Sequence, residues 1–158
     1  MPGLTIIKDD LTGEAVAALL ALHLDDMQQW SPPGTVHALP PERLRQPDVT
    51  FYTAWAGSGD QAVLAGCGAL KRLDADHGEI KSMRVAPALR GTGVGKALLH
   101  HLLAVARSRG YTRVSLETGR TEPFAPARGL YLANGFTECP PFADYVLDGF
   151  SICMTRTL

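Results

Sequence analysis

A glycine-rich turn between a short strand and a long helix is the feature that most restricts how this chain can fold. Segment 79–85 has strand character, and after a break at Pro87 an amphipathic helix is expected from Gly93 to about Arg109. The turn itself reads Arg90-Gly91-Thr92-Gly93-Val94-Gly95-Lys96. Glycines lack the Cβ atoms that would keep a ligand from the backbone N–H groups, and a helix N-terminus carries unpaired N–H groups and partial positive charge. The turn therefore predicts a phosphate or pyrophosphate site flanked by two cations.

Two common phosphate-binding motifs do not fit this turn. A Walker loop has four residues between its first glycine and Gly-Lys, followed by Ser or Thr. Here three residues separate Gly91 from Gly95, and Ala97 follows Lys96. The dinucleotide fingerprint G-x-G-x-x-G also fails, because these glycines read G-x-G-x-G. Neither a magnesium-nucleotide site nor a dinucleotide site is expected.

Two motifs resemble those of the GNAT superfamily of N-acetyltransferases. Arg90, Gly93 and Gly95 spell R-x-x-G-x-G, which resembles the acetyl-CoA-binding motif of that family. Segment 127–136, Ala-Arg-Gly-Leu-Tyr-Leu-Ala-Asn-Gly-Phe, resembles its second motif, A-x-x-L-Y-x-x-x-G-F. The resemblance covers nearly the whole chain and is closest to small bacterial single-domain members. It implies an α/β fold with a mixed, twisted central sheet of about seven strands flanked by about four helices.

The pattern of apolar residues and breakers predicts one domain over residues 1–158. Strands are expected at 4–8, 51–55, 62–72, 79–85 and 113–118, with closing strands at Phe136 and 151–157. Helices are expected at about 12–27, 40–45, 93–109 and 125–134, the first capped by Thr12. Segment 66–68, Gly-Cys-Gly, indicates a close backbone approach or a bulge.

The resemblance implies where acetyl-CoA binds. In the family the strands corresponding to 79–85 and 113–118 splay apart, and the pantetheine arm enters the wedge and pairs with strand backbone. The residues that the resemblance assigns to acetyl-CoA are Met83, Val85, Arg90, Gly91, Thr92, Gly93, Val94, Gly95, Lys96 and Tyr131. One departure is Phe124, which stands where many members carry an Asn that holds the pantetheine.

Acetyl transfer to an amine needs a base, an oxyanion donor and an acid for the departing thiolate. The resemblance assigns the acid to Tyr131, whose alternative is a packing role, and the oxyanion donor to the backbone N–H near Met83. Glu79 matches the family's strand glutamate and is the first candidate base; alternatively it lies at an exposed strand start and pairs with Lys81. Glu117, on the neighbouring strand, is the second candidate, and some members use a water chain instead.

The acceptor is expected to be a primary amine of a small molecule. Trp30, His37, Arg84 and Glu117 are the candidate acceptor-binding residues. Arg84 needs a carboxylate partner, either Glu117 or one brought by the substrate. His23 is a core residue or lies at an acceptor pocket with Asp26. A protein or peptide N-acetyltransferase and a catalytically silent acetyl-CoA-binding module remain alternatives, and nothing in the residues names the acceptor or the acyl chain length.

Charge and composition exclude several other functions. A net charge of −1 and a pI of about 6.5 argue against nucleic-acid binding. The longest apolar run, 15–22, is too short to cross a bilayer, and no leader is recognisable, so no membrane partner is expected. Three cysteines favour a reducing cytoplasm. The histidines fit no zinc spacing, the pair His100-His101 is expected at the surface, and no metal is predicted. The chain is expected to be a monomer or homodimer.

Overall fold

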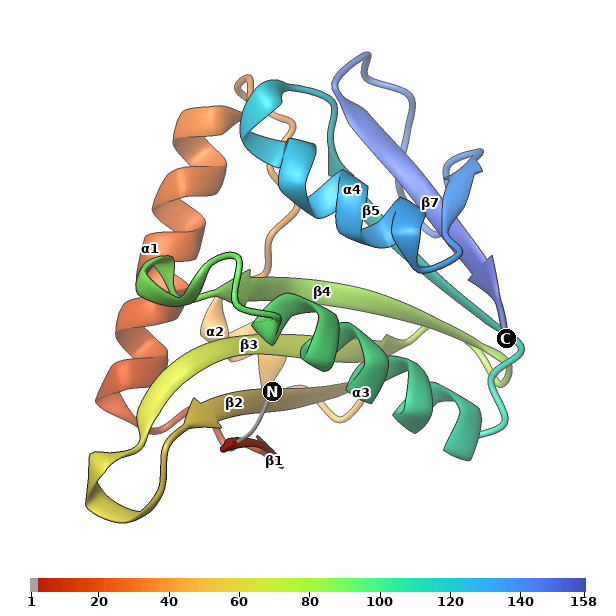
Figure 1. The fold of residues 1–158 in the computed structure, drawn as a ribbon. Helices are drawn as coiled ribbons and strands as arrows, with labels where there is room; N and C mark the ends of the chain where they lie inside the picture. The colour runs from red at the N-terminus through yellow and green to blue at the C-terminus, as the bar shows by residue number, and fades with distance from the viewer. Residues whose placement is uncertain (1–2) are drawn as a thin grey trace.

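A seven-stranded mixed sheet forms the centre of the molecule in the computed structural model, which describes residues 3–158 (Figure 1). The strands are β1 (Leu4–Lys8), β2 (Val49–Ala56), β3 (Val63–Arg72), β4 (His77–Val85), β5 (Arg113–Gly119), β6 (Thr137–Cys139) and β7 (Ser151–Thr157). Their spatial order is β1-β2-β3-β4-β5-β7-β6. The α-helices are α1 (Glu14–Trp30), α2 (Pro41–Leu44), α3 (Val94–Ser108) and α4 (Ala125–Ala133). The predicted fold, with its seven strands and four helices, is confirmed.

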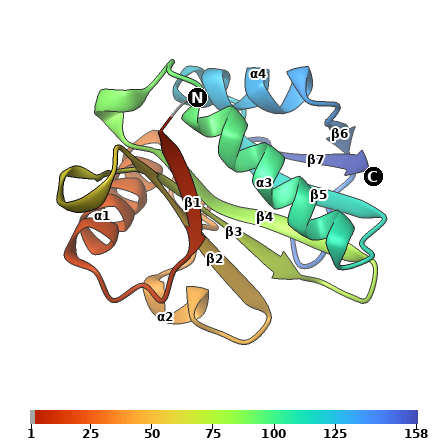
Figure 2. The same cartoon turned by 60° about the horizontal axis from the view of Figure 1, so that its bottom comes forward.

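Helices cover both faces of the sheet (Figure 2). On one face, Leu19 and Leu20 of α1 pack against Phe51 of β2 in a fully buried cluster. On the other face, α3 packs its apolar stripe, including Leu102, against Leu70 of β3. Helix α4 adds to this second core where it covers β5 and β7. A cleft lies where β4 and β5 part, and residues of both α1 and α4 line it.

The parallel pair β4 and β5 parts soon after it forms. Only three residue pairs join the two strands, the last being Glu79 with Ser115. Strand β4 then continues to Val85 and β5 to Gly119 without pairing to each other. The predicted splaying of these strands is therefore confirmed, and it leaves the ends of both strands open to a ligand.

A β-bulge distorts β4 just after the strands part. Lys81 lies opposite Ala69 and Arg84 opposite Cys67, so that two residues of β4 face one residue of β3. Ser82 is in the left-handed region, with φ of 53°. A bulge was predicted at residues 66–68, and the structure shows that the extra residue belongs to the partner strand. Two successive side chains can then point to the same face of the sheet.

The close backbone approach predicted at the Gly-Cys-Gly segment is also present, at Gly66. A Cβ added there would lie 2.7 Å from the Arg84 carbonyl oxygen and 2.9 Å from the Leu98 side chain. We expect Gly66→Ala to destabilise the protein by about 1–3 kcal/mol, because the backbone must shift to admit the methyl group. Thermal unfolding measures this as a fall in Tm of several degrees. Gly129→Ala is the matched control: it adds the same methyl group in helix α4, where nothing lies within 4 Å. It should raise Tm slightly, and equal Tm values for both variants would contradict the prediction.

Three local predictions were wrong. Thr12 does not cap α1; the N-cap is Gly13, and the Thr12 hydroxyl donates to Asp10 instead. Helix α1 also runs one turn further than the expected end at residue 27, and Trp30 is its last residue. Of the pair expected at the surface, His100 is exposed, but His101 is half-buried, with its ring 4.5 Å from the ring of Tyr52. Within residues 3–158, no helix is both long and apolar enough to cross a membrane.

Candidate active site

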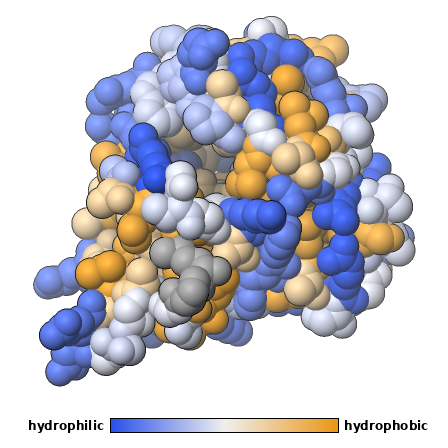
Figure 3. Space-filling view, in the orientation of Figure 1, coloured by the Kyte–Doolittle hydropathy of each residue, from blue (hydrophilic) through white to orange (hydrophobic). Residues whose placement is uncertain are grey.

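The parting of β4 and β5 opens a cleft of about 830 Å³. The surface is hollowed at this point between α1 and α4 (Figure 3). Residues from α1, β4, β5, α4 and the loops before α3 and before β7 line it. All the predicted cofactor residues except Thr92 lie along the cleft; the Thr92 hydroxyl turns away and donates to the carbonyl of Leu89.

The glycine-rich turn forms one end of the cleft. Gly91 has φ of 75° and Gly93 has φ of 97°, values that favour glycine. An added Cβ at either position would meet nothing within 4 Å, so the backbone here is open to a ligand. Gly93 is the N-cap of α3, and Arg90 and Lys96 line the same end of the cleft. The arrangement offers N–H groups, a helix N-terminus and two cations to an anion.

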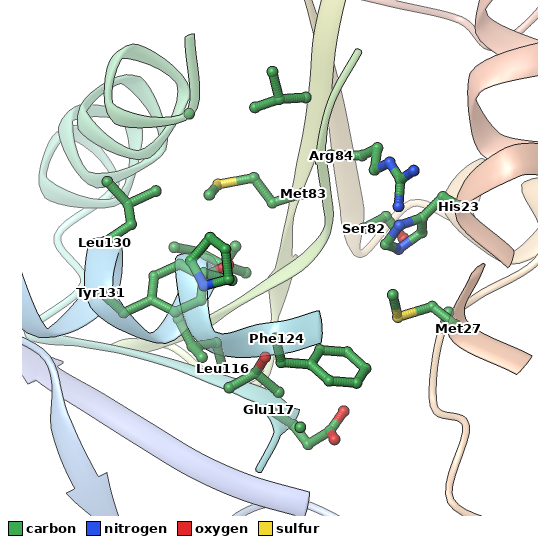
Figure 4. Close-up of a pocket in the computed structure, with 18 of the residues that line it drawn as sticks. His23, Met27, Ser82, Met83, Arg84, Leu116, Glu117, Phe124, Leu130 and Tyr131 are labelled. Carbon is green, nitrogen blue, oxygen red and sulfur yellow. The ribbon is translucent and has the colours of Figure 1, made fainter. Parts of the chain in front are cut away.

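Tyr131 lies where α4 meets the cleft (Figure 4). Its ring is buried in the core against Phe136, with centroids 5.7 Å apart. Burial raises the pKa of the phenol above its ordinary value, and the nearby carboxylate of Glu117 raises it further. The hydroxyl therefore keeps its proton at neutral pH. Among residues 3–158, no group accepts a hydrogen bond from it.

Phe124 is part of an aromatic wall. Its ring packs edge to face on Trp30, at 5.8 Å, and on Phe150, at 5.6 Å. The Asn that many family members carry at this position would offer an amide to the pantetheine arm. This protein instead presents an apolar ring there. The contact of this ring with Trp30 links α1 to the opposite side of the cleft.

Glu79 is buried within a hydrogen-bonded cluster. It is only 2% exposed, and it accepts hydrogen bonds from Lys81 Nζ, at 3.2 Å, and from the Tyr145 hydroxyl. The expected pairing with Lys81 is confirmed, but the exposed position was wrong because β4 begins two residues earlier, at His77. Tyr145 was missed, since it lies in segment 140–150, which has no periodic pattern.

Glu117 lies on β5, two residues beyond the last pairing with β4, and faces the cleft. Burial raises the pKa of this carboxyl to about 7, against the opposing effects of the Ser151 hydroxyl and the Lys81 ammonium. A carboxyl with this pKa is a carboxylate for part of the time at neutral pH and can also hold a proton. General bases have such pKa values.

Arg84 is paired with Asp26 and not with Glu117. The guanidinium Nη2 lies 2.5 Å from Asp26 Oδ2, and its centre lies 5.7 Å from the Trp30 ring. The prediction from strand adjacency was wrong because β4 and β5 have separated before this point. The bulge turns the arginine toward α1, which supplies both contacts.

Two loops meet at the cleft beside Glu79. His37, from the loop after α1, packs its ring edge to face on Tyr145 at 5.0 Å. Its Nε2 lies 4.0 Å from Asp148 Oδ2. The four residues predicted to bind the acceptor, Trp30, His37, Arg84 and Glu117, all line the cleft. Within the described part of the chain, no group of three or more His, Cys, Asp and Glu side chains could hold a metal ion.

A splayed parallel strand pair beside a glycine-rich turn is the arrangement that the resemblance to acyl-CoA-dependent transferases implies. The chain belongs to the acetyltransferase (GNAT) family, which residues 13–136 match. It is 52% identical over 150 residues to the uncharacterized N-acetyltransferase YsnE of Bacillus subtilis (strain 168), covering 95% of this chain and 97% of that protein. It is 33% identical over 162 residues to the IAA acetyltransferase of Azospirillum brasilense, covering 100% of both. A crystal structure described as an acyl-CoA N-acyltransferase from Klebsiella pneumoniae superimposes with a TM-score of 0.76 at 31% identity, covering 98% of this chain and 97% of that one. The predicted family, fold and enzyme class are confirmed.

Proposed function

We propose that the protein transfers the acetyl group of acetyl-CoA to a primary amine of a small molecule, by direct attack in a ternary complex. The observation that carries this proposal is that one cleft has an anion site at one end and two carboxyl groups, the buried Glu79 and the partly buried Glu117, on its acceptor side. The acceptor side is enclosed by the contact between His37 and Tyr145 and by the aromatic wall around Phe124. Such enclosure suits a small acceptor better than an extended peptide.

The proposed reaction uses three groups of this chain. The carboxylate of Glu117 takes a proton from the acceptor ammonium, and the freed amine nitrogen attacks the thioester carbon. The backbone N–H of Met83, just after the bulge, donates to the oxygen that becomes negative. As the carbon–sulfur bond breaks, Tyr131 gives its proton to the sulfur. The acetylated nitrogen then loses its remaining excess proton, which restores the phenol of Tyr131, and Glu117 passes its own proton to solvent. The products are the N-acetylated amine and the free thiol of CoA.

Glu117 is a better candidate base than Glu79 in this arrangement. Glu79 Oε2 already accepts two hydrogen bonds, from Lys81 and Tyr145, which hold this carboxylate within its own cluster. Glu117 has a pKa of about 7, which matches a base that works at neutral pH. We assign Glu79 to positioning Lys81 and segment 140–150 instead.

The pH dependence tests this assignment. Because the carboxylate is the active form, kcat of the wild type should fall about tenfold per pH unit below pH 7. In Glu117→Gln this acidic limb of the pH profile should disappear, and kcat at pH 8 should be about 100-fold lower than in the wild type. Titration of the acceptor amine is common to both proteins and does not affect the comparison. Glu79→Gln is the control and should keep the limb. If Glu79→Gln abolishes the limb and Glu117→Gln keeps it, the roles of the two residues are reversed.

A stability measurement on the same variant separates lost catalysis from lost folding. The pKa of Glu117 is raised in the folded protein, so the carboxyl stabilises the fold less as pH rises from about 4.5 to about 7. Glu117→Gln should therefore have a Tm a few degrees above wild type at pH 8, and this gain should be smaller at pH 5.

The alternatives are a protein or peptide acetyltransferase and a silent acetyl-CoA-binding module. A thiol-release assay with amino acids, polyamines, aminoglycosides and short peptides decides among them. The proposal expects turnover with a small amine; preference for peptides, or acetyl-CoA binding without turnover of any acceptor, would contradict it. The name of the Azospirillum relative, IAA acetyltransferase, supports a small acceptor.

A further inference from the structure

Three buried polar atoms without hydrogen-bond partners gather on one side of the cleft. They are His23 Nδ1, Ser82 Oγ and Arg84 Nε, and all three residues line the cleft. The structure has one other such atom among residues 3–158, His101 Nε2, which lies outside the cleft. We call His23, Ser82 and Arg84 the polar corner.

The local structure explains why these three side chains lie together. Ser82 and Arg84 are two residues apart on β4 and both point toward α1, whereas Met83 between them points to the opposite side, as alternation along a strand requires (Figure 4). On α1, His23 and Asp26 are three residues apart and share a helix face. The ion pair between Arg84 and Asp26 then draws the strand and the helix together at the corner.

The corner has hydrogen-bonding capacity that the protein does not use. His23 is 8% exposed and Arg84 is 7% exposed, so water does not freely satisfy them. Buried polar groups are nearly always hydrogen-bonded, and an unpaired one costs about 1–3 kcal/mol. Asp26 accepts from Nη2 of Arg84 and leaves Nε without a partner. A ligand group at the corner would remove this cost.

The free atoms favour a ligand that accepts hydrogen bonds and carries negative charge. Arg84 Nε–H can only donate, and the Ser82 hydroxyl is free to donate as well. His23 is neutral near pH 7, because burial and the charge of Arg84 lower its pKa to about 4, and its Nδ1 can carry the proton. A planar pair of oxygens suits a guanidinium edge better than a single hydroxyl or an ammonium does.

We propose that the polar corner binds the carboxylate of the acceptor, which makes the acceptor an amino acid. This inference rests on the proposed function, since it names the acceptor class for the same cleft. Glu117 lies across the cleft on β5 and takes the ammonium end, so the two ends of the acceptor meet groups of opposite character. Trp30 and Met27 border the corner and suit an apolar side chain.

Matched acceptors test the corner on the wild-type enzyme. We would measure thiol release with L-phenylalanine, L-phenylalaninamide and phenethylamine, and with the corresponding compounds of L-methionine and L-leucine. The amino acids should have kcat/KM at least about 10-fold above their amides and amines. The amide has the less basic amino group and so more free amine, which makes the comparison conservative. Amides or amines that react as well as the amino acids would overturn the inference while leaving the proposed function intact.

Ser82→Ala supplies the matching variant. It removes one donor of the corner and should raise KM for the amino acids about 10-fold, with KM for acetyl-CoA and for phenethylamine nearly unchanged. His101→Gln is the control, because it alters the unpaired atom outside the cleft and should change none of these constants. Equal effects of Ser82→Ala on amino acid and amine would overturn the inference. Arg84 is left in place, because its removal would leave the partly buried Asp26 carboxylate without its ion-pair partner and destabilise the fold.

If no acceptor reacts, that result counts against the proposed function. A binding measurement then tests the carboxylate site by itself. Calorimetric titration with 3-phenylpropionate, which has the carboxylate but no amine, should show binding to the wild type and about 10-fold weaker binding to Ser82→Ala. Absence of binding to the wild type would overturn the carboxylate site as well.

Discussion

Tyr131→Phe is expected to lower kcat by about 100-fold or more while leaving the affinity for acetyl-CoA nearly unchanged. The variant loses one oxygen, and the phenylalanine ring keeps the core contact with Phe136. General acid catalysis contributes about 100- to 10,000-fold, and without the phenol the thiolate must leave unprotonated. Steady-state kinetics gives kcat, and calorimetry gives the acetyl-CoA affinity.

Tyr111→Phe is the matched control for this prediction. Tyr111 is buried in the same core as Tyr131 but does not line the cleft. Its replacement should change Tm slightly and kcat not at all. If both variants turned over acetyl-CoA at the wild-type rate, Tyr131 would be a packing residue and the acid would have to be sought elsewhere.

Gly93→Asp is expected to abolish acetyl-CoA binding in a protein that still folds. The aspartate adds a negative charge at the N-cap of α3, where we place the pyrophosphate. Its side chain has room, since nothing lies within 4 Å of an added Cβ, so the effect should fall on the ligand rather than on packing. Calorimetry should show an affinity loss of at least about 100-fold, with a circular dichroism spectrum like that of the wild type.

Two controls separate charge from backbone strain. Gly93→Asn adds a side chain of nearly the same size without the charge, and Asn tolerates positive φ about as well as Asp does. It should weaken binding much less. Gly110→Asp places the same residue at the other end of α3, where φ is 79° and nothing lies within 4 Å, and should leave binding unchanged. Unchanged affinity in folded Gly93→Asp would remove the pyrophosphate from this turn.

The cofactor end of the cleft was predictable because neighbouring residues encode it. The strand, the glycine turn and the helix that form it are contiguous, and each glycine reports a local backbone need such as the positive φ of Gly93. The motif around Tyr131 is likewise a single run on one helix. Patterns of this kind need no knowledge of distant contacts.

The acceptor side was predicted only in part, because its contacts join distant segments. Arg84 was matched to Glu117 by the rule that parallel neighbours face each other, and that rule fails where β4 and β5 have separated. A bulge in a strand cannot be located to one residue from its partner's glycines alone. Tyr145 reaches Glu79 from 66 residues away, and no local pattern signals such a contact.

The early separation of β4 and β5 leaves two unpaired strand edges in the middle of a sheet. Backbone N–H and C=O groups there lack the partners that the rest of the sheet provides, so amide hydrogens on the C-terminal halves of both strands should exchange with solvent faster than those near Glu79 and Ser115. A ligand that pairs with these edges would complete the sheet and stabilise the fold in proportion to the logarithm of its concentration. The lifetime of this protein against proteolysis should therefore rise and fall with the amount of acetyl-CoA around it.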